Sequence, residues 1–177
     1  MFPESVPLDG RSVEVDASKS ILEYWESVRG SKFAPEFGSE FKLLDLGADV
    51  IPCSSVVDVI DGGATFRYRF WGTLNVDIKG FEMTGKCLEE GPITEVETVG
   101  HLHFGEVMKR REPVAFVYRG ARQMIDHTKQ ITFRYPLSSD GRTVDKIFSW
   151  QNLNDRAGVW VESFEDFWQA KKDSDGA

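Results

Sequence analysis

FRYRFWGTLNVDIKGFEMTGK, residues Phe66 to Lys86, carries the clearest structural signals in this chain. Its first residues alternate between aromatic and basic side chains, which is the period of a strand. The alternation ends at Trp71-Gly72-Thr73, and a short apolar segment with glycines follows as far as Met83-Thr84-Gly85-Lys86. A strand that runs into short helical turns can form the wall of a small pocket. We therefore expect a binding cavity here, with Gly72-Thr73 and Thr84-Gly85 as its corners.

A hairpin precedes this break. Val56 to Ile60 is a β-branched run, Asp61-Gly62-Gly63 has the residues that a tight turn requires, and residues 64–70 alternate. The alternation predicts an aromatic row that faces inward, with Arg67 and Arg69 facing outward or at the rim. Two guanidinium groups on one strand face can clamp a carboxylate or a phosphate. The alternative is that they are solvated strand charges paired with nearby acidic groups.

Two longer helices are predicted on either side of this hairpin. Residues Ser18 to Arg29 place apolar side chains at spacings of three and four, and Gly30 ends the pattern. Within it, the Tyr24-Trp25 pair is expected to dock the helix on the domain core. The longest helix is predicted over about residues 93–110, and Pro113 stops it.

Three more strands complete the predicted sheet: Val114 to Arg119, Lys129 to Leu137 and Thr143 to Asn152. Their connections favour antiparallel pairing with their neighbours. Residues 31–55 are irregular, and a loop of this length in a compact domain predicts some local helix. The pattern as a whole predicts an α+β domain.

The predicted domain spans residues 18–153. Residues 1–17 contain two prolines and no stable period, so we expect an N-terminal arm. Residues 154–177 form a C-terminal tail whose aromatic residues, from Trp160 to Trp168, fall at helical spacing. Such an amphipathic stripe is expected to dock on its own domain or on a second copy, with disorder in the last residues.

Composition excludes several classes of protein. Of the 177 residues 41% are apolar, with 13 Phe and 5 Trp, which predicts a packed core and argues against disorder. A net charge of −8 disfavours nucleic acid and anionic membranes as partners, because both select basic surfaces. Two cysteines do not suggest a disulfide framework, and neither a signal peptide nor a membrane span is recognisable. We expect a soluble cytoplasmic protein.

No constellation in the sequence predicts catalysis, so we expect no enzyme. The three histidines are His101, His103 and His127, and two histidines two positions apart on a helix do not form a chelating pair. The chain has no Gly-x-Ser-x-Gly motif, no Gly-x-Gly-x-x-Gly motif and no phosphate-binding loop. We predict neither catalytic residues nor a metal site.

The central stretch carries a family resemblance. Arg69-Phe-Trp-Gly72-Thr73-Leu74, then Gly80, then Met83-Thr84-Gly85-Lys86 resemble the Arg-x-x-Gly-Thr … Gly … Thr-Gly signature of stand-alone proteobacterial PAS proteins. The helix with Ile21-Leu-Glu-Tyr24-Trp25 is similar to the entrance helix of that subfamily. At Ala34-Pro35-Glu36-Phe37 the chain lacks the arginine of the subfamily's Pro-x-Arg element. The resemblance covers about residues 18–153.

The resemblance implies a PAS-like five-stranded antiparallel sheet in the order 2-1-5-4-3, with helices over one face and an additional N-terminal helix. The cavity between sheet and helices holds a ligand or cofactor in PAS proteins. The face assignments above select the pocket candidates, for which plain core packing is the alternative. They are Phe70, Leu74, Ile78, Phe81, Met83, Phe104, Met108, Phe116, Phe133, Phe148 and Trp150.

Two cofactors of the PAS fold can be compared with the residues, and the cofactor itself stays unknown. Flavin photosensors carry Asn-Cys-Arg-Phe-Leu-Gln after the equivalent glycine, and here Cys87 is retained without the Asn, Arg and Gln. Haem-binding relatives place a histidine on the long helix, where His101 and His103 lie, but basic residues for the propionates are not evident. The residues disfavour both cofactors.

The leading functional expectation is a sensory or regulatory PAS domain that binds a small molecule in an apolar cavity and signals through protein–protein contacts. The alternative is a pure interaction or dimerisation module with a filled core, whose homodimer interface uses Tyr24, Trp25 and the Trp160–Trp168 stripe. A third possibility is a small α+β enzyme of ferredoxin-like or ketosteroid-isomerase-like architecture. It would need a buried acid or base, for which only His103 and Asp77 qualify.

Overall fold

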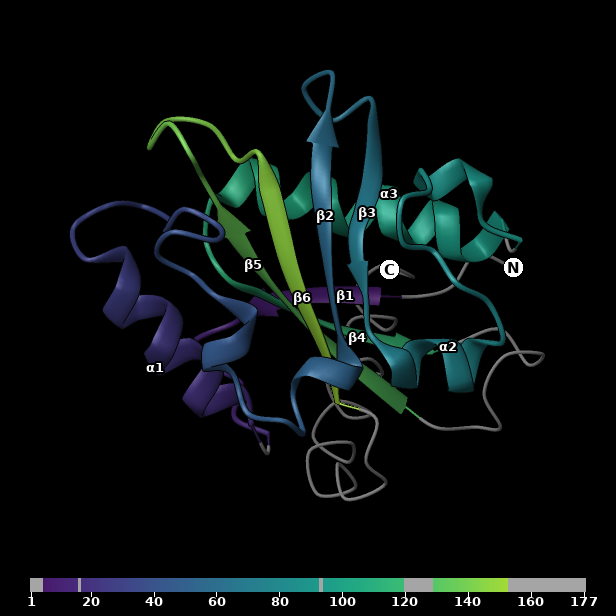
Figure 1. Cartoon of the computed structure of the whole chain (residues 1–177), viewed down its shortest axis with the longest axis horizontal. Coiled ribbons are helices and arrows are strands. Elements are labelled where there is room, and N and C mark those ends of the chain that lie inside the picture. The colour runs from purple at the N-terminus through teal and green to yellow at the C-terminus, as the bar shows by residue number, and fades with distance from the viewer. Residues whose placement is uncertain (1–4, 16, 93, 120–128, 153–177) are drawn as a thin grey trace, which may run out of the picture.

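The computed structural model describes residues 5–15, 17–92, 94–119 and 129–152 (Figure 1). This part of the chain is α+β, with an open six-stranded antiparallel sheet and few helices. None of its helices is long and apolar enough to cross a membrane. The predicted tail at 154–177, with the Trp160–Trp168 stripe, and His127 lie outside the described residues.

The sheet has the order β1-β4-β5-β6-β2-β3, and every neighbouring pair is antiparallel. The predicted strand positions are confirmed, with shifts of one to three residues at some ends. The bounds are β1 Ser5–Asp9, β2 Ser54–Ile60, β3 Thr65–Trp71, β4 Val114–Arg119, β5 Lys129–Leu137 and β6 Lys146–Asn152.

The predicted number of five strands is wrong, because part of the expected N-terminal arm belongs to the sheet. Strand β1 pairs with β4 from Ser5 opposite Tyr118 to Asp9 opposite Val114. Pro7 obscures this strand in the sequence, since proline lacks an N–H and weakens any strand pattern. An edge strand tolerates it, because one row of its backbone groups has no partner strand to pair with.

Helices cover both faces of the sheet (Figure 1). The long helix α3, Thr94–Arg110, lies across one face, which we call the α3 face. Helix α1, Ser18–Arg29, lies with the segment 30–53 on the opposite face, which we call the α1 face. The remaining elements are α2 Thr73–Lys79 and the 3₁₀ turns η1 Leu43–Asp45, η2 Ile51–Cys53 and η3 Leu88–Glu90.

The Tyr24-Trp25 pair fixes α1 to the α1 face. Trp25 is fully buried, and its Nε1–H donates to the carbonyl oxygen of Pro136 at 3.0 Å. The Tyr24 hydroxyl accepts from the Lys42 N–H at 2.9 Å and donates to Asp45 Oδ2 at 3.0 Å. The prediction that this pair docks the helix on the domain core is confirmed. The alternative that Trp25 forms a dimer interface is wrong, because its side chain is enclosed by its own domain.

A β-bulge in β3 overturns the predicted strict alternation of Phe66, Tyr68 and Phe70. Val56 lies opposite Phe70 and Val57 opposite Tyr68, so Arg69 is an extra residue in β3. The extra residue reverses the faces beyond it. Phe66 and Tyr68 belong to the apolar cluster of the α3 face, whereas Phe70 packs against the cluster of the α1 face.

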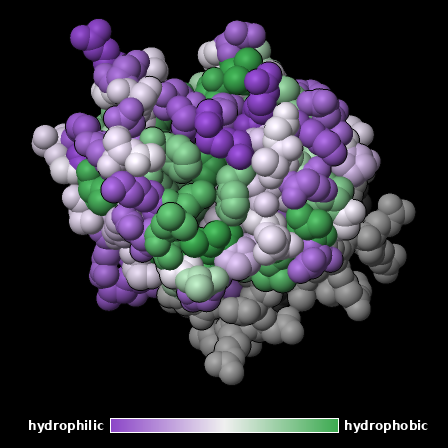
Figure 2. Space-filling model, in the orientation of Figure 1, coloured by the Kyte–Doolittle hydropathy of each residue, from purple (hydrophilic) through white to green (hydrophobic). Residues whose placement is uncertain are grey.

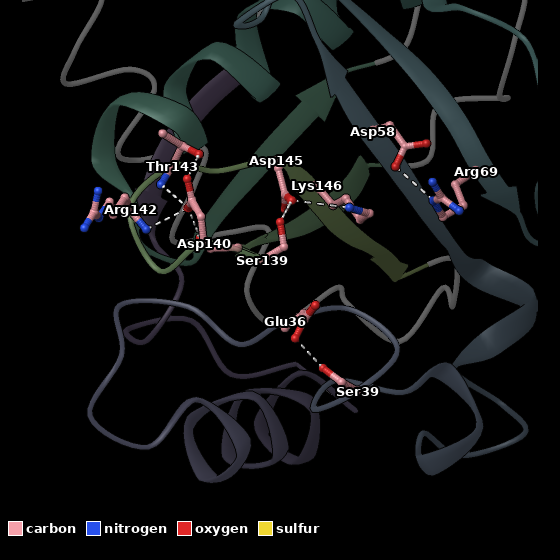
Figure 3. A network of polar contacts seen from close by, with 11 residues as sticks. Glu36, Ser39, Asp58, Arg69, Ser139, Asp140, Arg142, Thr143, Asp145 and Lys146 are labelled. Carbon is pink, nitrogen blue, oxygen red and sulfur yellow. Dashed lines mark hydrogen bonds and ion pairs between the residues drawn. The ribbon is translucent and has the colours of Figure 1, made fainter.

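The two strand arginines are exposed. Arg69 Nε donates to Asp58 Oδ1 at 2.9 Å across the β2–β3 hairpin (Figure 3). This pairing agrees with the alternative that Arg69 is a solvated strand charge next to an acidic group. No such partner is found for Arg67 among the described residues.

Strand β6 begins three residues later than predicted because Asp140 organises the preceding turn (Figure 3). Its carboxylate accepts from the backbone N–H groups of Arg142 and Thr143, both at 2.8 Å, and from the Thr143 hydroxyl. These hydrogen bonds hold the pKa of Asp140 well below its usual range. The backbone N–H of Thr143 is therefore committed to the turn and not to the sheet.

Candidate functional site

The structure divides the predicted pocket residues between the two faces of the sheet. Those on the α3 face are Phe81, Met83, Phe104, Met108 and Phe116, and those on the α1 face are Phe70, Phe133, Phe148 and Trp150. Leu74 is half-buried in α2, and the side chain of Ile78 lies outside the described set. The sheet separates the two groups, so these residues do not line one common cavity.

Strands β5 and β6 explain this division. Their aromatic residues face α1, for example Phe133 and Tyr135 of β5. The alternating polar residues of β5 therefore face α3, and Thr132 and Arg134 are both buried there. The polar row of a strand is expected to face solvent when one face of the sheet is open. Here it lies under α3, so the α3 face contains buried polar groups that the sequence did not reveal.

Arg134 is the centre of these buried polar groups. Only 8% of the residue is exposed, and its Nη1 donates to the Ser149 Oγ at 2.7 Å. Its Nη2 lies 3.4 Å from Nδ1 of His103, and the guanidinium carbon lies 4.2 Å from the ring centre of Phe104. The Nε–H of Arg134 has no hydrogen-bond partner among the described residues. A buried guanidinium is thus held in place by β6 and α3 with one donor unused.

Arg134 has no carboxylate partner in the described part of the chain, and neither has Lys79. Lys79, at the C-terminal end of α2, is half-buried, and its Nζ lies 4.6 Å from the ring centre of Trp71. Burial lowers the pKa of Lys79 to about 7, and the charge of Arg134 acts in the same direction. Burial also lowers the pKa of Arg134 to about 10. Two basic groups therefore approach one another, and the described residues place no carboxylate beside either of them.

Tyr68 and His103 complete the basic cluster, which we define as Tyr68, Lys79, His103, Arg134 and Ser149. Burial raises the pKa of Tyr68 to about 12, against the opposing effect of Arg134. Burial and the Arg134 charge hold the pKa of His103 far below its ordinary value, so the ring is neutral at pH 7. Both side chains are uncharged neighbours of Arg134 and supply no compensating charge.

The hydrogen-bond pattern determines the tautomer of His103. A guanidinium only donates, so the Nδ1 atom that faces Arg134 must be the acceptor. The proton of the neutral ring is then on Nε2, which is buried and has no partner among the described residues. The ring is stacked on Phe116 with 3.8 Å between ring centres. His103 therefore presents a second unused donor on the α3 face.

Glycines bring the covering elements close to the sheet and to one another. A Cβ atom at Gly72 would lie 2.3 Å from the carbonyl oxygen of Pro52, so only glycine allows α2 to start beside η2. A Cβ at Gly100 would lie 2.8 Å from Leu88 Cδ2, so the lack of a side chain at Gly100 allows α3 to pack against η3. Gly85 has φ +83° and its N–H donates to the Tyr68 carbonyl at 2.7 Å. The Gly72 and Gly85 corners are thus places where the chain turns against β3.

The residues considered for cofactors and catalysis are placed as follows. His101 is half-buried, with Nε2 2.9 Å from Glu89 Oε1, and Cys87 is half-buried at the start of η3. Asp77 is exposed on α2, so it is not the buried acid that the enzyme possibility requires. Across the described residues no group of three or more His, Cys, Asp or Glu is arranged to hold a metal ion.

A separate surface hollow of about 450 Å³ lies beside the turn that joins β2 and β3. It contains Met108 and Val144, and its polar rim includes Arg111, Arg142 and Asp145. None of its lining residues belongs to the basic cluster. Its arginines are exposed and therefore hydrated, so this hollow lacks the unpaired buried groups that mark the basic cluster.

Of the basic cluster, only His103 was a candidate site residue on the sequence alone. Arg134 alternates with aromatic residues in β5, and that pattern alone predicts a solvated side chain. One signal in the sequence was available. Helices were predicted both before and after the hairpin, and two such helices can cover both faces of the sheet. No protein-family model matches the chain, and no curated protein matches it. Among the described residues, the unused groups of the cluster are hydrogen-bond donors, so the cluster can accommodate an acceptor group.

Proposed function

We propose that the protein is a sensory or regulatory domain of PAS type, without catalytic activity, that binds a small molecule on the α3 face and signals through protein contacts. The observation that carries this proposal is the pair of unused donors, Arg134 Nε–H and His103 Nε2–H, buried between α3 and the sheet. Buried polar groups in folded proteins are almost always hydrogen-bonded. A guest molecule under α3 would satisfy both.

The sheet topology supports the PAS assignment. With the N-terminal strand set aside, the strands lie in the order β3-β2-β6-β5-β4, which corresponds to 2-1-5-4-3. The elements that follow β3 are the short helix α2, the turn η3 and the long helix α3. The added strand β1 extends the sheet at its β4 edge and leaves this order unchanged.

The residues of the resemblance have structural roles that fit a ligand-binding wall. Gly72 allows α2 to start close to η2. The turn at Thr84-Gly85-Lys86 is hydrogen-bonded to both the backbone N–H and the backbone carbonyl of Tyr68. The Tyr68 N–H donates to the Lys86 carbonyl at 2.9 Å, and its carbonyl accepts from Gly85. Tyr68 is a member of the basic cluster, so the signature positions hold the backbone of a candidate ligand contact.

Native mass spectrometry tests the proposal directly. Protein purified under gentle conditions is expected to carry a small molecule that is lost on denaturation, or to gain thermal stability from members of a library of charged and neutral compounds. A single species at the mass of the chain, with no stabilising compound of either class, would contradict it. The same spectra with and without a stabilising compound report whether the oligomeric state responds to the ligand.

An interaction module remains the second candidate, because apolar side chains gather on the face of the molecule seen in Figure 2. Ile51, Cys53 and Phe70 are only partly buried where they pack on the α1 face. Light scattering of a Phe70→Glu variant tests this candidate. A wild-type dimer that dissociates in the variant supports it, and an unchanged oligomeric state removes this face from consideration.

A further inference from the structure

We infer that the site on the α3 face binds an organic carboxylate, with the carboxylate group on Arg134 and His103 and an apolar body against the aromatic side chains around them. The inference rests on the proposed function and adds the chemical class of the ligand. Three independent features of the basic cluster lead to it: its charge, its hydrogen-bond polarity and its walls.

The first feature is uncompensated positive charge. Burying an ionised group is costly unless it is paired, and Arg134 and Lys79 share one region with no carboxylate partner among the described residues. The chain is not short of acidic groups, since its net charge is −8. Those with partners are engaged elsewhere, as Asp58 is with Arg69 and Glu89 with His101. An anion is the group that this arrangement lacks among the described residues.

The second feature is the polarity of the unused hydrogen-bonding atoms. Arg134 Nε and His103 Nε2 both carry hydrogens, so both require an acceptor. A hydroxyl, an amide or water supplies acceptors as well, but only an anion also compensates the guanidinium charge. Hydrogen bonds between charged partners are roughly twice as strong as those between neutral ones. A carboxylate has two acceptor oxygens, which is the number of unused donors.

The third feature separates a carboxylate from a phosphate. The cluster is enclosed by aromatic rings, with Phe104 beneath Arg134, Phe116 stacked on His103 and Trp71 beneath Lys79. Phosphate sites use many N–H donors, commonly at a helix N-terminus, whereas an apolar wall favours a ligand with an apolar body. A monoanion with a hydrocarbon or aromatic body satisfies both the charge and the walls.

Isothermal titration calorimetry with matched pairs of compounds tests the inference. The acids are phenylacetate, benzoate, octanoate and decanoate, each paired with its neutral primary amide, and inorganic phosphate is a separate arm. We expect at least one acid to bind the wild-type protein and its amide to bind at least tenfold more weakly. We expect Arg134→Met to weaken that acid by about 10- to 100-fold, since a hydrogen bond to a charged group contributes about 1.5–3 kcal/mol.

Arg142→Met is the matched control, because Arg142 is an exposed arginine in the β5–β6 turn outside the basic cluster (Figure 3). It removes the same charge and is expected to leave acid binding unchanged. Near-UV circular dichroism establishes that Arg134→Met is folded, and Ser149→Ala provides a milder second variant that frees one donor of Arg134. That variant is expected to weaken the acid less than Arg134→Met does.

Several results would overturn the inference. Amides that bind as tightly as their acids would refute the anionic ligand and leave the proposed small-molecule function standing. Phosphate binding that competes with every acid would refute the apolar body. Acid binding that survives Arg134→Met, or that is lost equally in Arg142→Met, would place the anion elsewhere. If no compound of any arm binds the wild-type protein, the inference fails and the proposed function loses its main support.

Discussion

Replacing Arg134 by methionine is expected to change the stability of the ligand-free protein by no more than about 1 kcal/mol, although it removes a well-packed residue with a buried charge. Folding lowers the pKa of Arg134 from 12.5 to about 10, and each pKa unit is worth about 1.4 kcal/mol, so the buried charge costs about 3 kcal/mol. The opposing losses are the hydrogen bond from the charged guanidinium to Ser149, worth about 1.5–3 kcal/mol, and the contact with Phe104, worth about 0.5–1 kcal/mol. The cost and the losses therefore nearly cancel, and the net change is within about 1 kcal/mol of zero.

Methionine suits the experiment because its unbranched side chain fills the space of the arginine stem over Phe104 and needs no hydrogen-bond partner. Urea unfolding followed by tryptophan fluorescence measures the free energy of unfolding. For a chain of this size a change of about 1 kcal/mol corresponds to a shift of about 2–4 °C in Tm. The Arg142→Met variant is expected to stay within about 0.5 kcal/mol of the wild type, as exposed substitutions usually do.

If Arg134 is buried because it binds a ligand, the Arg134→Met variant should also respond less to that ligand. An acid that binds the wild-type protein must raise its stability more than it raises that of Arg134→Met at the same acid concentration, because ligand stabilisation increases with affinity. The reasoning is refuted if Arg134→Met lowers the free energy of unfolding by more than about 1 kcal/mol in the absence of ligand. Arg134 would then be a structural residue whose contacts with Ser149 and Phe104 outweigh its desolvation.

Other expected outcomes concern stability. Burial holds the pKa of His103 below its unfolded value of 6.5, so the unfolded chain binds the extra proton and stability falls as pH drops below 6.5. At pH 5.5 this loss is about 1.4 kcal/mol relative to neutral pH. The His103→Asn variant should not show this loss when its urea unfolding is measured as a function of pH. An equal slope of unfolding free energy against pH in both proteins would contradict the neutral buried ring. Gly72→Ala is expected to cost at least about 2 kcal/mol in thermal unfolding, since its Cβ would overlap the Pro52 carbonyl, whereas Gly105→Ala, where a Cβ meets nothing, serves as the control that should not be destabilised. Trp25→Phe should lower the free energy of unfolding by about 1–3 kcal/mol through the loss of the Pro136 hydrogen bond and of packing, and an unchanged value would mean that α1 does not depend on this contact.

Local patterns were sufficient for the positions of most elements. A β-branched run located β2, period-two alternation located β3 to β6, and spacings of three and four located α1 and α3. The bounds of α1 agree with the prediction because Gly30 can adopt φ +56°, which ends a helix at little cost. Such signals depend only on residues that are close together in the chain, so they can be recognised from the sequence alone.

Other features depended on contacts between distant residues. Strand β1 exists because its backbone pairs with β4, more than 100 residues away, and no pattern within Ser5–Asp9 requires that pairing. The bulge at Arg69 depends on the register between β2 and β3, and one extra residue moved Phe70 to the opposite face. Strict alternation in a sequence therefore does not establish a common face.

The candidate site shows the same division. The stretch from Phe66 to Lys86 predicted the two corners of the chain beside β3, since glycine at positions 72 and 85 predicts close approach and a turn. Alternation in β5 showed that Arg134 lies opposite the aromatic row, but a period of two does not say which row is covered. Burial is decided by what packs on each face. Only the tertiary structure placed α3 over the polar row of β5, and this turned an ordinary strand arginine into an unpaired buried cation.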